Sequence, residues 1–280
     1  MVVIGRRALG PIGEKMRQNT MKTKLYSGEP AVGVSLTFPS SHMVEILAHC
    51  GFDWVLLDCE HGSMTAETVE TMIMASELAG IIPIIRPPAS WSDELPRLLD
   101  RGAMGVQMPH IRTAEDAKRA VEVVKSPPLG QRGMGAASIR SATFEMAIGR
   151  SDYIDWVNNE TLVCIQIEDI EAVRNLDSIL KVQEVDVFFV GPTDLSGSMG
   201  YLKDPGNSEV RKTVQDTLTT IISAGRIAGC VGPPDTIAQF AQQGVHYLYT
   251  HVPTLLKNPA AEALAKVRTA AKSTSLKGPL

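Results

Sequence analysis

The sequence predicts an α/β fold, a single-domain (β/α)8 barrel over residues 31–280, preceded by an N-terminal arm over residues 1–30. Eight short apolar runs alternate with eight longer helical stretches. The apolar runs lack a polar face, which is typical of parallel strands covered by helices. Eight such units over about 240 residues favour a closed barrel over an open, doubly wound sheet. The open sheet stays the alternative, because strand number alone does not prove closure.

The first four units follow one another closely. Their expected strands are AVGVSLTF (31–38), DWVLLD (53–58), IIPIIR (81–86) and MGVQMP (104–109). Their expected helices are SHMVEILAHCG (41–51), TAETVETMIMASELAG (65–80), SDELPRLLDRG (92–102) and TAEDAKRAVEVVK (113–125). Each helix begins at Ser or Thr, and the first three end at Gly, as expected of residues that cap the two ends of a helix.

The last four units come after a long interruption. Their expected strands are LVCIQIE (162–168), VDVFFVG (185–191), RIAGCVG (226–232) and HYLYTHV (246–252). Their expected helices are IEAVRNLDSILKV (170–182), SEVRKTVQDTLTTIISAG (208–225), PDTIAQFAQQG (234–244) and NPAAEALAKVRTAAK (258–272). The interruption, residues 126–160, contains SPPLGQRGMGAAS. A connection of this length is usually functional, and we expect RGMGAAS (132–138) within it to be a flexible lid.

Composition excludes several classes of protein. Lys and Arg number 27 against 31 Asp and Glu, a net charge of −4, whereas a nucleic-acid-binding domain normally carries a basic excess. Because no stretch approaches 18 uninterrupted apolar residues, we expect no membrane span. Four widely spaced cysteines without a C-x-x-C pair indicate reduced thiols and a cytoplasmic protein. The basic start of the arm leaves organelle targeting open.

Reactive side chains gather where the expected strands end. They are Asp58, Cys59, Glu60 and His61 after the second strand, Arg86 at the end of the third, Gln107 and His110 in and after the fourth, Gln166, Glu168 and Asp169 in and after the fifth, and Thr193 and Asp194 after the sixth. The carboxyl ends of the strands carry the active sites of (β/α)8 enzymes. We therefore expect these groups to converge on one catalytic mouth.

Two of these residues suit a divalent cation. Mg²⁺ is typically held by one or two carboxylates, and Glu168 and Asp194 supply such a pair. A 2-oxo acid can complete the coordination, and the cation then stabilises an enolate as negative charge develops. The planar guanidinium of Arg86 suits the substrate carboxylate or the enolate oxygen. Because no expected strand ends in Lys, this metal route is favoured over a Schiff base.

Five sequence blocks resemble the HpcH/HpaI aldolase family of metal-dependent pyruvate aldolases. The blocks are FDWVLLDCEHG (52–62), IIRPP (84–88), LLDRGAMGVQMP (98–109), IQIED (165–169) and GPTDLSGSMG (191–200). They are spread over about 150 residues in the order that the family uses. The resemblance implies a (β/α)8 barrel, a hexamer with exchanged C-terminal helices, and Mg²⁺, Mn²⁺ or Co²⁺ as the cofactor.

The resemblance also implies a role for each matching residue. Glu168 and Asp194 would be the metal ligands, and Arg86 would stabilise the enolate. Gln166, with the backbone of Gly191 and Thr193, would contact the pyruvyl group. His61 with Asp58 would form an acid–base dyad, which Asp100 would support across a subunit boundary.

His110 resembles a residue of a fungal family member that decarboxylates oxaloacetate and adds the pyruvate enolate to a 2-pyrone. That relative also uses a Tyr before the fifth strand, for which Tyr153 is the nearest candidate. The eighth strand departs from the family, because it ends THVPTLL where many relatives carry Gly/Ser-Asp.

We therefore expect a divalent-metal lyase that forms a pyruvate enolate, by decarboxylating oxaloacetate or by retro-aldol cleavage of 4-hydroxy-2-oxo acids. The partner is a small 2-oxo acid, with no nucleic acid or membrane involved, and the protein is expected to be a homo-oligomer. The alternative is a catalytically lapsed barrel that serves as a binding or assembly protein.

Overall fold

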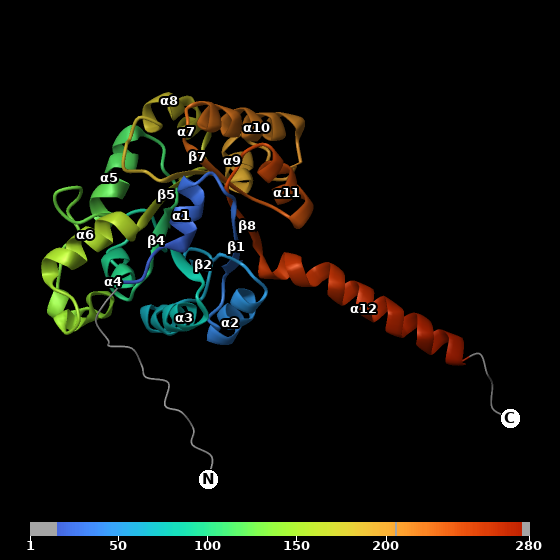
Figure 1. The fold of residues 1–280 in the computed structure, drawn as a ribbon. Coiled ribbons are helices and arrows are strands. Elements are labelled where there is room, and N and C mark those ends of the chain that lie inside the picture. Colours follow the sequence, from blue (N-terminus) through green and yellow to red (C-terminus); the bar gives the residue numbers. More distant parts are fainter. Residues whose placement is uncertain (1–15, 205, 276–280) are drawn as a thin grey trace, which may run out of the picture.

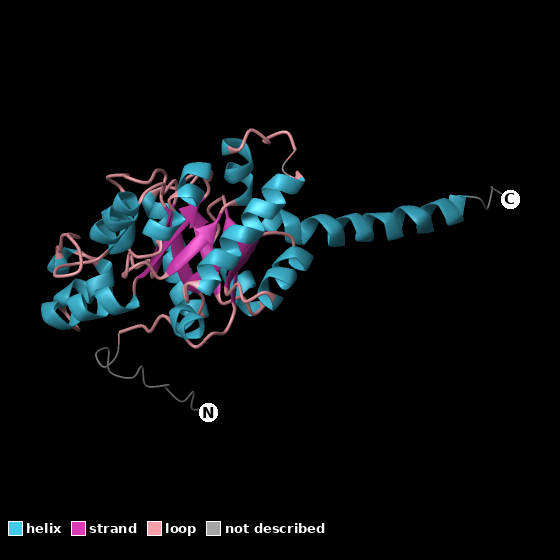
Figure 2. Cartoon of the chain, turned by 90° about the horizontal axis from the view of Figure 1, so that it is seen from above, coloured by secondary structure: helices cyan, strands magenta, loops and turns pink. Residues whose placement is uncertain are grey.

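Eight parallel strands close into a barrel in the computed structural model, which describes residues 16–204 and 206–275. The strands are β1 (Ala31–Leu36), β2 (Trp54–Asp58), β3 (Ile82–Arg86), β4 (Gly105–Met108), β5 (Leu162–Ile167), β6 (Val187–Val190), β7 (Ile227–Val231) and β8 (Tyr247–His251). Each strand pairs with the next, and β8 returns to β1. Figures 1 and 2 show helices around the outside of this ring. The predicted (β/α)8 barrel is confirmed, and the open sheet is excluded.

Two apolar layers hold the barrel together, because successive residues of a strand point to opposite faces. Inside the ring, Trp54, Phe189, Tyr247 and Tyr249 form an aromatic interior. A second and larger cluster fills the space between the strands and the helices. The interior is crowded: a Cβ on Gly33 would lie 2.3 Å from the Trp54 ring. Side chains therefore fill the interior of the barrel below the carboxyl ends of the strands.

Most helices lie where the sequence predicts them. They are α2 (Ser41–His49), α3 (Ala66–Ala79), α4 (Leu95–Asp100), α5 (Ala114–Val124), α10 (Ser208–Ser223), α11 (Pro234–Gln242) and α12 (Val252–Ser275). A capping box at Thr65 starts α3, and Gly80 ends it with a left-handed backbone. The helix expected at 170–182 is divided at Asn175 into α7 (Ile170–Arg174) and α8 (Leu176–Ile179).

Helix α1 (Thr20–Tyr26) was not predicted and covers the amino-terminal end of the barrel. Met21 and Leu25 are buried against the aromatic interior. Asn19 caps the helix and donates a hydrogen bond to the backbone oxygen of Met104 at 2.9 Å. Residues 1–15 of the expected arm lie outside the described residues, so the division at residue 30 stays a prediction. Helix α1 therefore closes the amino-terminal end of the barrel.

The 126–160 segment is folded, while the flexible lid expected at residues 132–138 within it stays a prediction. It contains two short 3-10 helices, η1 (Ala136–Ser138) and η2 (Arg140–Glu145), and helix α6 (Arg150–Glu160). Tyr153 and Val157 of α6 pack on Ala142 in a separate apolar cluster. The buried Lys125 donates from Nζ to backbone oxygens of Asn158 and Thr161, at 2.6 and 2.7 Å. These contacts fasten the segment to the side of the barrel.

Helix α12 begins directly after β8 and extends far from the barrel (Figures 1 and 2). Its side chains from Leu256 through Ala271 are exposed, including those of Leu264 and Val267. Neither α12 nor any other helix of the described ranges has the combination of length and apolar character that crossing a membrane requires.

Candidate active site

A cavity of about 170 Å³ opens at the carboxyl ends of the strands. Seven of its lining residues are sequence-predicted: His61, Arg86, Gln166, Glu168, Gly191, Thr193 and Asp194. The others are Phe189, Pro192, Val231, Tyr249 and His251. Residues far apart in the chain meet here because parallel strands all end at the same rim.

Arg86 lies in a buried ion pair at the floor of the mouth. Its register partner on β2 is Asp58, and the guanidinium contacts that carboxylate at two points, Nε to Oδ1 at 2.9 Å and Nη2 to Oδ2 at 2.5 Å. Glu60 Oε2 lies 3.3 Å from Nε. Burial alone would lower the pKa of Arg86, but the hydrogen bonds to Asp58 and the nearby acidic groups raise it above its usual value. The guanidinium therefore stays charged and fixed in direction.

Glu168 is 3 % exposed and carries a crowded carboxylate. Burial raises its pKa, and the charges of Asp194 and Glu60 add to that rise, while donation from the backbone and the proximity of His110 oppose it. The backbone N–H of His110 donates to Oε1 at 2.7 Å, and Gln166 Nε2 donates to Oε2. A carboxylate whose protonation is favoured by neighbouring negative charges lies in a negative potential, which also favours a cation.

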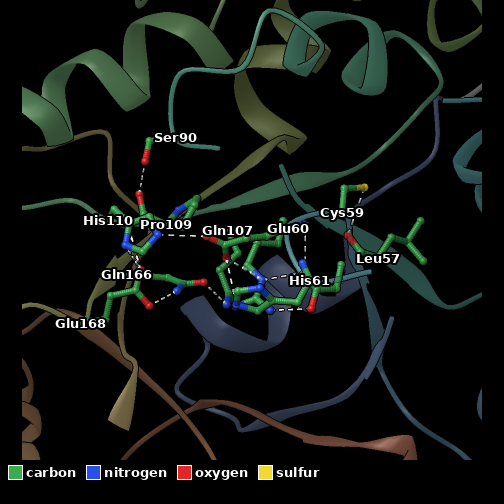
Figure 3. Close-up of polar contacts among 12 residues, drawn as sticks. Leu57, Cys59, Glu60, His61, Ser90, Gln107, Pro109, His110, Gln166 and Glu168 are labelled. Atoms are coloured by element: carbon green, nitrogen blue, oxygen red, sulfur yellow. Dashed lines mark hydrogen bonds and ion pairs between the residues drawn. The ribbon is translucent and has the colours of Figure 1, made fainter. Parts of the chain in front are cut away.

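His110 bridges two acidic residues across the mouth, as Figure 3 shows. Its Nε2 lies 3.0 Å from Glu60 Oε1, and its Nδ1 lies 3.2 Å from Glu168 Oε1. The residue has a φ of 54°, a left-handed conformation that a side chain with a Cβ rarely adopts. Such strain persists only where the surroundings impose it and is common at functional sites.

A chain of buried amides supports Glu168 from below. Gln166 accepts from Gln107 Nε2 at 2.7 Å, and Gln107 Oε1 accepts from the Tyr247 hydroxyl at 3.0 Å. All three side chains are buried inside the barrel. This series of hydrogen bonds connects the aromatic interior to the cavity, and Figure 3 shows its part from Gln107 through Gln166 to Glu168.

In the predicted His61–Asp58 dyad, the Asp58 carboxylate contacts the backbone N–H of His61 and not its imidazole. Asp58 Oδ1 accepts from the backbone N–H of His61 at 3.2 Å, while the His61 side chain is 60 % exposed. Its Nε2 lies 3.9 Å from Glu60 Oε2. The structure therefore places the His61 imidazole at the rim of the cavity and commits the Asp58 carboxylate to Arg86.

Two predicted residues lie away from the cavity. Asp100 ends α4 and pairs with Arg132 at 3.0 Å. Tyr153 is buried under the 126–160 segment, where its hydroxyl lies 2.7 Å from Ser141 Oγ. The structure does not bring either of them together with Arg86 and Glu168.

Sequence reasoning assigned no role to four residues of the site: Glu60, Gln107, Tyr249 and His251. Glu60 and Gln107 stand in the strand-end blocks, so their position was a usable signal. Tyr249 and His251 lie on β8, where period-two alternation after Tyr247 would have placed both on the inner face of the barrel.

The donor chemistry of the site fits a hard divalent cation. Glu168 and Asp194 line the cavity together, and both offer carboxylate oxygens. Within residues 16–204 and 206–275, no group of three or more His, Cys, Asp or Glu side chains is arranged to hold a metal ion. Mg²⁺ is often held by one or two carboxylates, with water and substrate oxygens completing its shell, so two carboxylates beside an open cavity are compatible with it.

The fold and the site define a class: a barrel enzyme whose paired carboxylates and buried arginine meet at the strand ends. A family model described as HpcH/HpaI aldolase/citrate lyase matches residues 34–252. The chain belongs to this family and is a carbon–carbon lyase.

Three known proteins show how the chain relates to the family. It is 36 % identical to a 4-hydroxy-2-oxo-heptane-1,7-dioate aldolase of Shigella sonnei over 93 % of this chain and 98 % of that protein. It is 31 % identical to a solved HpcH/HpaI aldolase/citrate lyase family protein of Burkholderia cenocepacia, with a TM-score of 0.83 over 90 % of this chain and all of the other. Macrophomate synthase, the fungal relative suggested by His110, aligns with a TM-score of 0.79 over 91 % of this chain and 90 % of its own. At 22 % identity this last likeness shows the shared fold alone.

Proposed function

We propose that the chain is a divalent-metal-dependent pyruvate lyase that cleaves 4-hydroxy-2-oxo acids to pyruvate and an aldehyde, and that also decarboxylates oxaloacetate. The observation that carries the proposal is the placement of Glu168, Asp194 and Arg86 around one cavity. Both reactions leave the same pyruvate enolate, so one constellation serves both. The aldolase names of relatives at about 35 % identity support the same chemistry.

The buried arginine is suited to the developing negative charge. Arg86 is held by Asp58 at two points, so its guanidinium is already oriented when the C3–C4 bond of the substrate breaks. Preorganised charge of this kind costs little reorganisation during the reaction. We assign Arg86 to the enolate oxygen, and Gln166 with the backbone of Gly191 and Thr193 to the pyruvyl group.

Glu168 and Asp194 would hold the metal ion, with Mg²⁺, Mn²⁺ and Co²⁺ as the candidates. When bound, the ion would polarise the keto group and offset the charge of the enolate. In the structure, His110 and Gln166 donate hydrogen bonds to the Glu168 carboxylate. We propose that these donors orient the carboxylate toward the cavity.

His61 is our candidate for the acid–base group that takes the proton of the C4 hydroxyl. Its exposed imidazole stands at the rim, where an incoming substrate would meet it. Asp100 would support it from a neighbouring copy of the chain in a homo-oligomer. His110 would assist when oxaloacetate is the substrate. Tyr153, our candidate for a further substrate contact, lies in the cluster beneath the 126–160 segment.

Helix α12 is the element that we propose to join the copies, in a hexamer with exchanged C-terminal helices. Its exposed apolar residues, among them Leu264 and Val267, would be covered by a second copy. Four free cysteines in the described chain are compatible with work in the reducing cytoplasm. Light scattering of the purified protein tests the hexamer.

The test of the proposed function is pyruvate release from 4-hydroxy-2-oxo acids and from oxaloacetate. We expect activity with Mg²⁺, Mn²⁺ or Co²⁺ and its loss with EDTA. Glu168→Ala should abolish pyruvate release, whereas Glu171→Ala, three residues on and exposed, should leave it unchanged. Turnover that persists in EDTA, or a Glu168→Ala variant with wild-type activity, would contradict the proposal.

A further inference from the structure

His251 ends β8 and lines the cavity without a defined task in the proposed chemistry. The groups that we assign to pyruvate come from β3, from the end of β5 and from the start of helix α9 (Pro192–Ser198), which follows β6. Another part of the wall comes from β7 and β8, through Val231, Tyr249 and His251. Of these three, His251 is the only one with a polar group that is not buried deep in the barrel.

The ring of His251 is held in place while its nitrogens are free. It stands edge-on to Tyr249, with ring centroids 5.6 Å apart and an interplanar angle of 86°. In the part of the chain that the structure describes, no protein group forms a hydrogen bond or ion pair with either ring nitrogen. His110, at the mouth of the site, contrasts with it, because both of its nitrogens face carboxylates.

The environment of His251 favours its uncharged imidazole. Burial lowers its pKa, and the charge of Arg86 lowers it further, against a smaller opposing effect of Asp58. A neutral imidazole offers one donor and one acceptor. Such a group pairs well with a hydroxyl, which can accept from one nitrogen or donate to the other, and has no net charge with which to attract a carboxylate.

We propose that His251 is a specificity-determining residue that hydrogen bonds to the aldehyde half of the substrate and favours aldehydes with a hydroxyl group beside the carbonyl. The inference rests on the proposed function, because it takes the pyruvyl half to lie against Arg86, Glu168 and Asp194. When the aldehyde lacks this hydroxyl, the His251 imidazole is left without a hydrogen-bond partner, and the site disfavours that aldehyde. This places a specificity element at the strand where the sequence departs from the family pattern.

Aldol addition of pyruvate to two aldehydes of equal size tests the proposal. Glycolaldehyde carries the hydroxyl, and propionaldehyde carries a methyl group in its place. We expect the metal-loaded wild-type protein to prefer glycolaldehyde by kcat/KM. His251→Phe retains a ring against Tyr249 but removes both nitrogens, so the preference should fall about tenfold, mainly through KM for glycolaldehyde. His246→Phe, just before the other end of β8, is the matched control and should leave the preference unchanged.

Exchange of the pyruvate methyl protons for deuterium separates the two halves of the substrate, because it needs no aldehyde. His251→Phe should exchange at the wild-type rate within about twofold. An unchanged aldehyde preference in His251→Phe would overturn the inference. So would a loss of exchange in that variant, or a wild-type protein that prefers propionaldehyde. A wild-type protein that neither exchanges nor condenses would contradict the proposed function itself, and the inference with it.

Discussion

The side-chain amide of Gln107 donates a hydrogen bond to the amide oxygen of Gln166, 2.7 Å away. This bond decides which way the Gln166 amide faces. An ionised Glu168 carboxylate can only accept, so Gln166 must turn its NH2 group toward it and its oxygen toward Gln107. The Tyr247 hydroxyl then completes the series by donating to Gln107. A buried tyrosine thus orients a residue of the cavity through two amides.

Tyr247→Phe should loosen this orientation without opening a cavity. We expect kcat/KM for the 4-hydroxy-2-oxo acid to fall about three- to tenfold, because one hydrogen bond of the series is lost and Gln107 can reverse its amide. The free energy of unfolding should fall by about 1 kcal/mol. Steady-state kinetics and urea unfolding measure the two effects. Tyr201→Phe, which removes an exposed hydroxyl bonded to Glu209, is the control; equal kinetics in the two variants would contradict the positioning role.

Asp58→Asn should destabilise the protein as well as inactivate it. The substitution leaves the buried Arg86 charge with Glu60 as the remaining one of its two carboxylate contacts, and removing one partner of a buried ion pair typically costs about 3 kcal/mol or more. Urea unfolding should show that loss. Asp216→Asn breaks an exposed pair with Lys212 and should change the free energy of unfolding by less than about 1 kcal/mol. Similar losses in both variants would show that the Asp58–Arg86 pair is not buried.

The strands could be predicted from the sequence because their signal is local. Residues 53–58 are apolar throughout the middle of the run and form β2 at Trp54–Asp58, since a strand inside a helical layer has no polar face. Helices α1 and α6 escaped prediction for the opposite reason. They are short or polar, and the burial that stabilises them, as for Tyr153, comes from residues distant in the chain.

The same difference between local signals and contacts distant in the chain applies to the site. The strand-end rule found Arg86 and Glu168, because a position at the end of a strand is readable from sequence. It could not pair Gln107 with Gln166, which are 59 residues apart, or find the bridge of His110 between two carboxylates. That bridge depends on a left-handed backbone at one residue of a loop.

Gly191→Ala should inactivate the enzyme while leaving the barrel folded. A Cβ on Gly191 would lie 2.9 Å from both Cβ and Oε2 of Glu168, so the carboxylate would have to move. We expect kcat/KM to fall at least about tenfold, since displacement of a site group by about 1 Å is enough for such a loss. Gly197→Ala, in the same helix α9 (Pro192–Ser198), meets only Leu202 at 3.5 Å and is the control. Helix propensity should make that control up to about 1 kcal/mol more stable; a matching activity loss there would refute the steric explanation.

Lys125 should make stability rise with pH in the alkaline range. Its side chain is buried at the end of α5, and burial together with the nearby charge of Lys22 lowers its pKa from 10.5 to about 8. Between about pH 8 and pH 10.5 the unfolded chain therefore binds more protons at this residue than the folded chain does. Wherever the unfolded state binds more protons, the free energy of unfolding increases with pH.

The comparison with Lys125→Met isolates this effect, because the other titrating groups are common to both proteins. The variant loses the two hydrogen bonds to the backbone of Asn158 and Thr161, so it should be less stable at every pH. The difference in the free energy of unfolding, wild type minus variant, should be smallest below pH 8 and should grow up to pH 10.5. Urea unfolding at half-unit intervals measures it. A difference that stays constant or shrinks across this range would mean that Lys125 keeps an ordinary pKa, and that its ammonium group reaches water in spite of the burial.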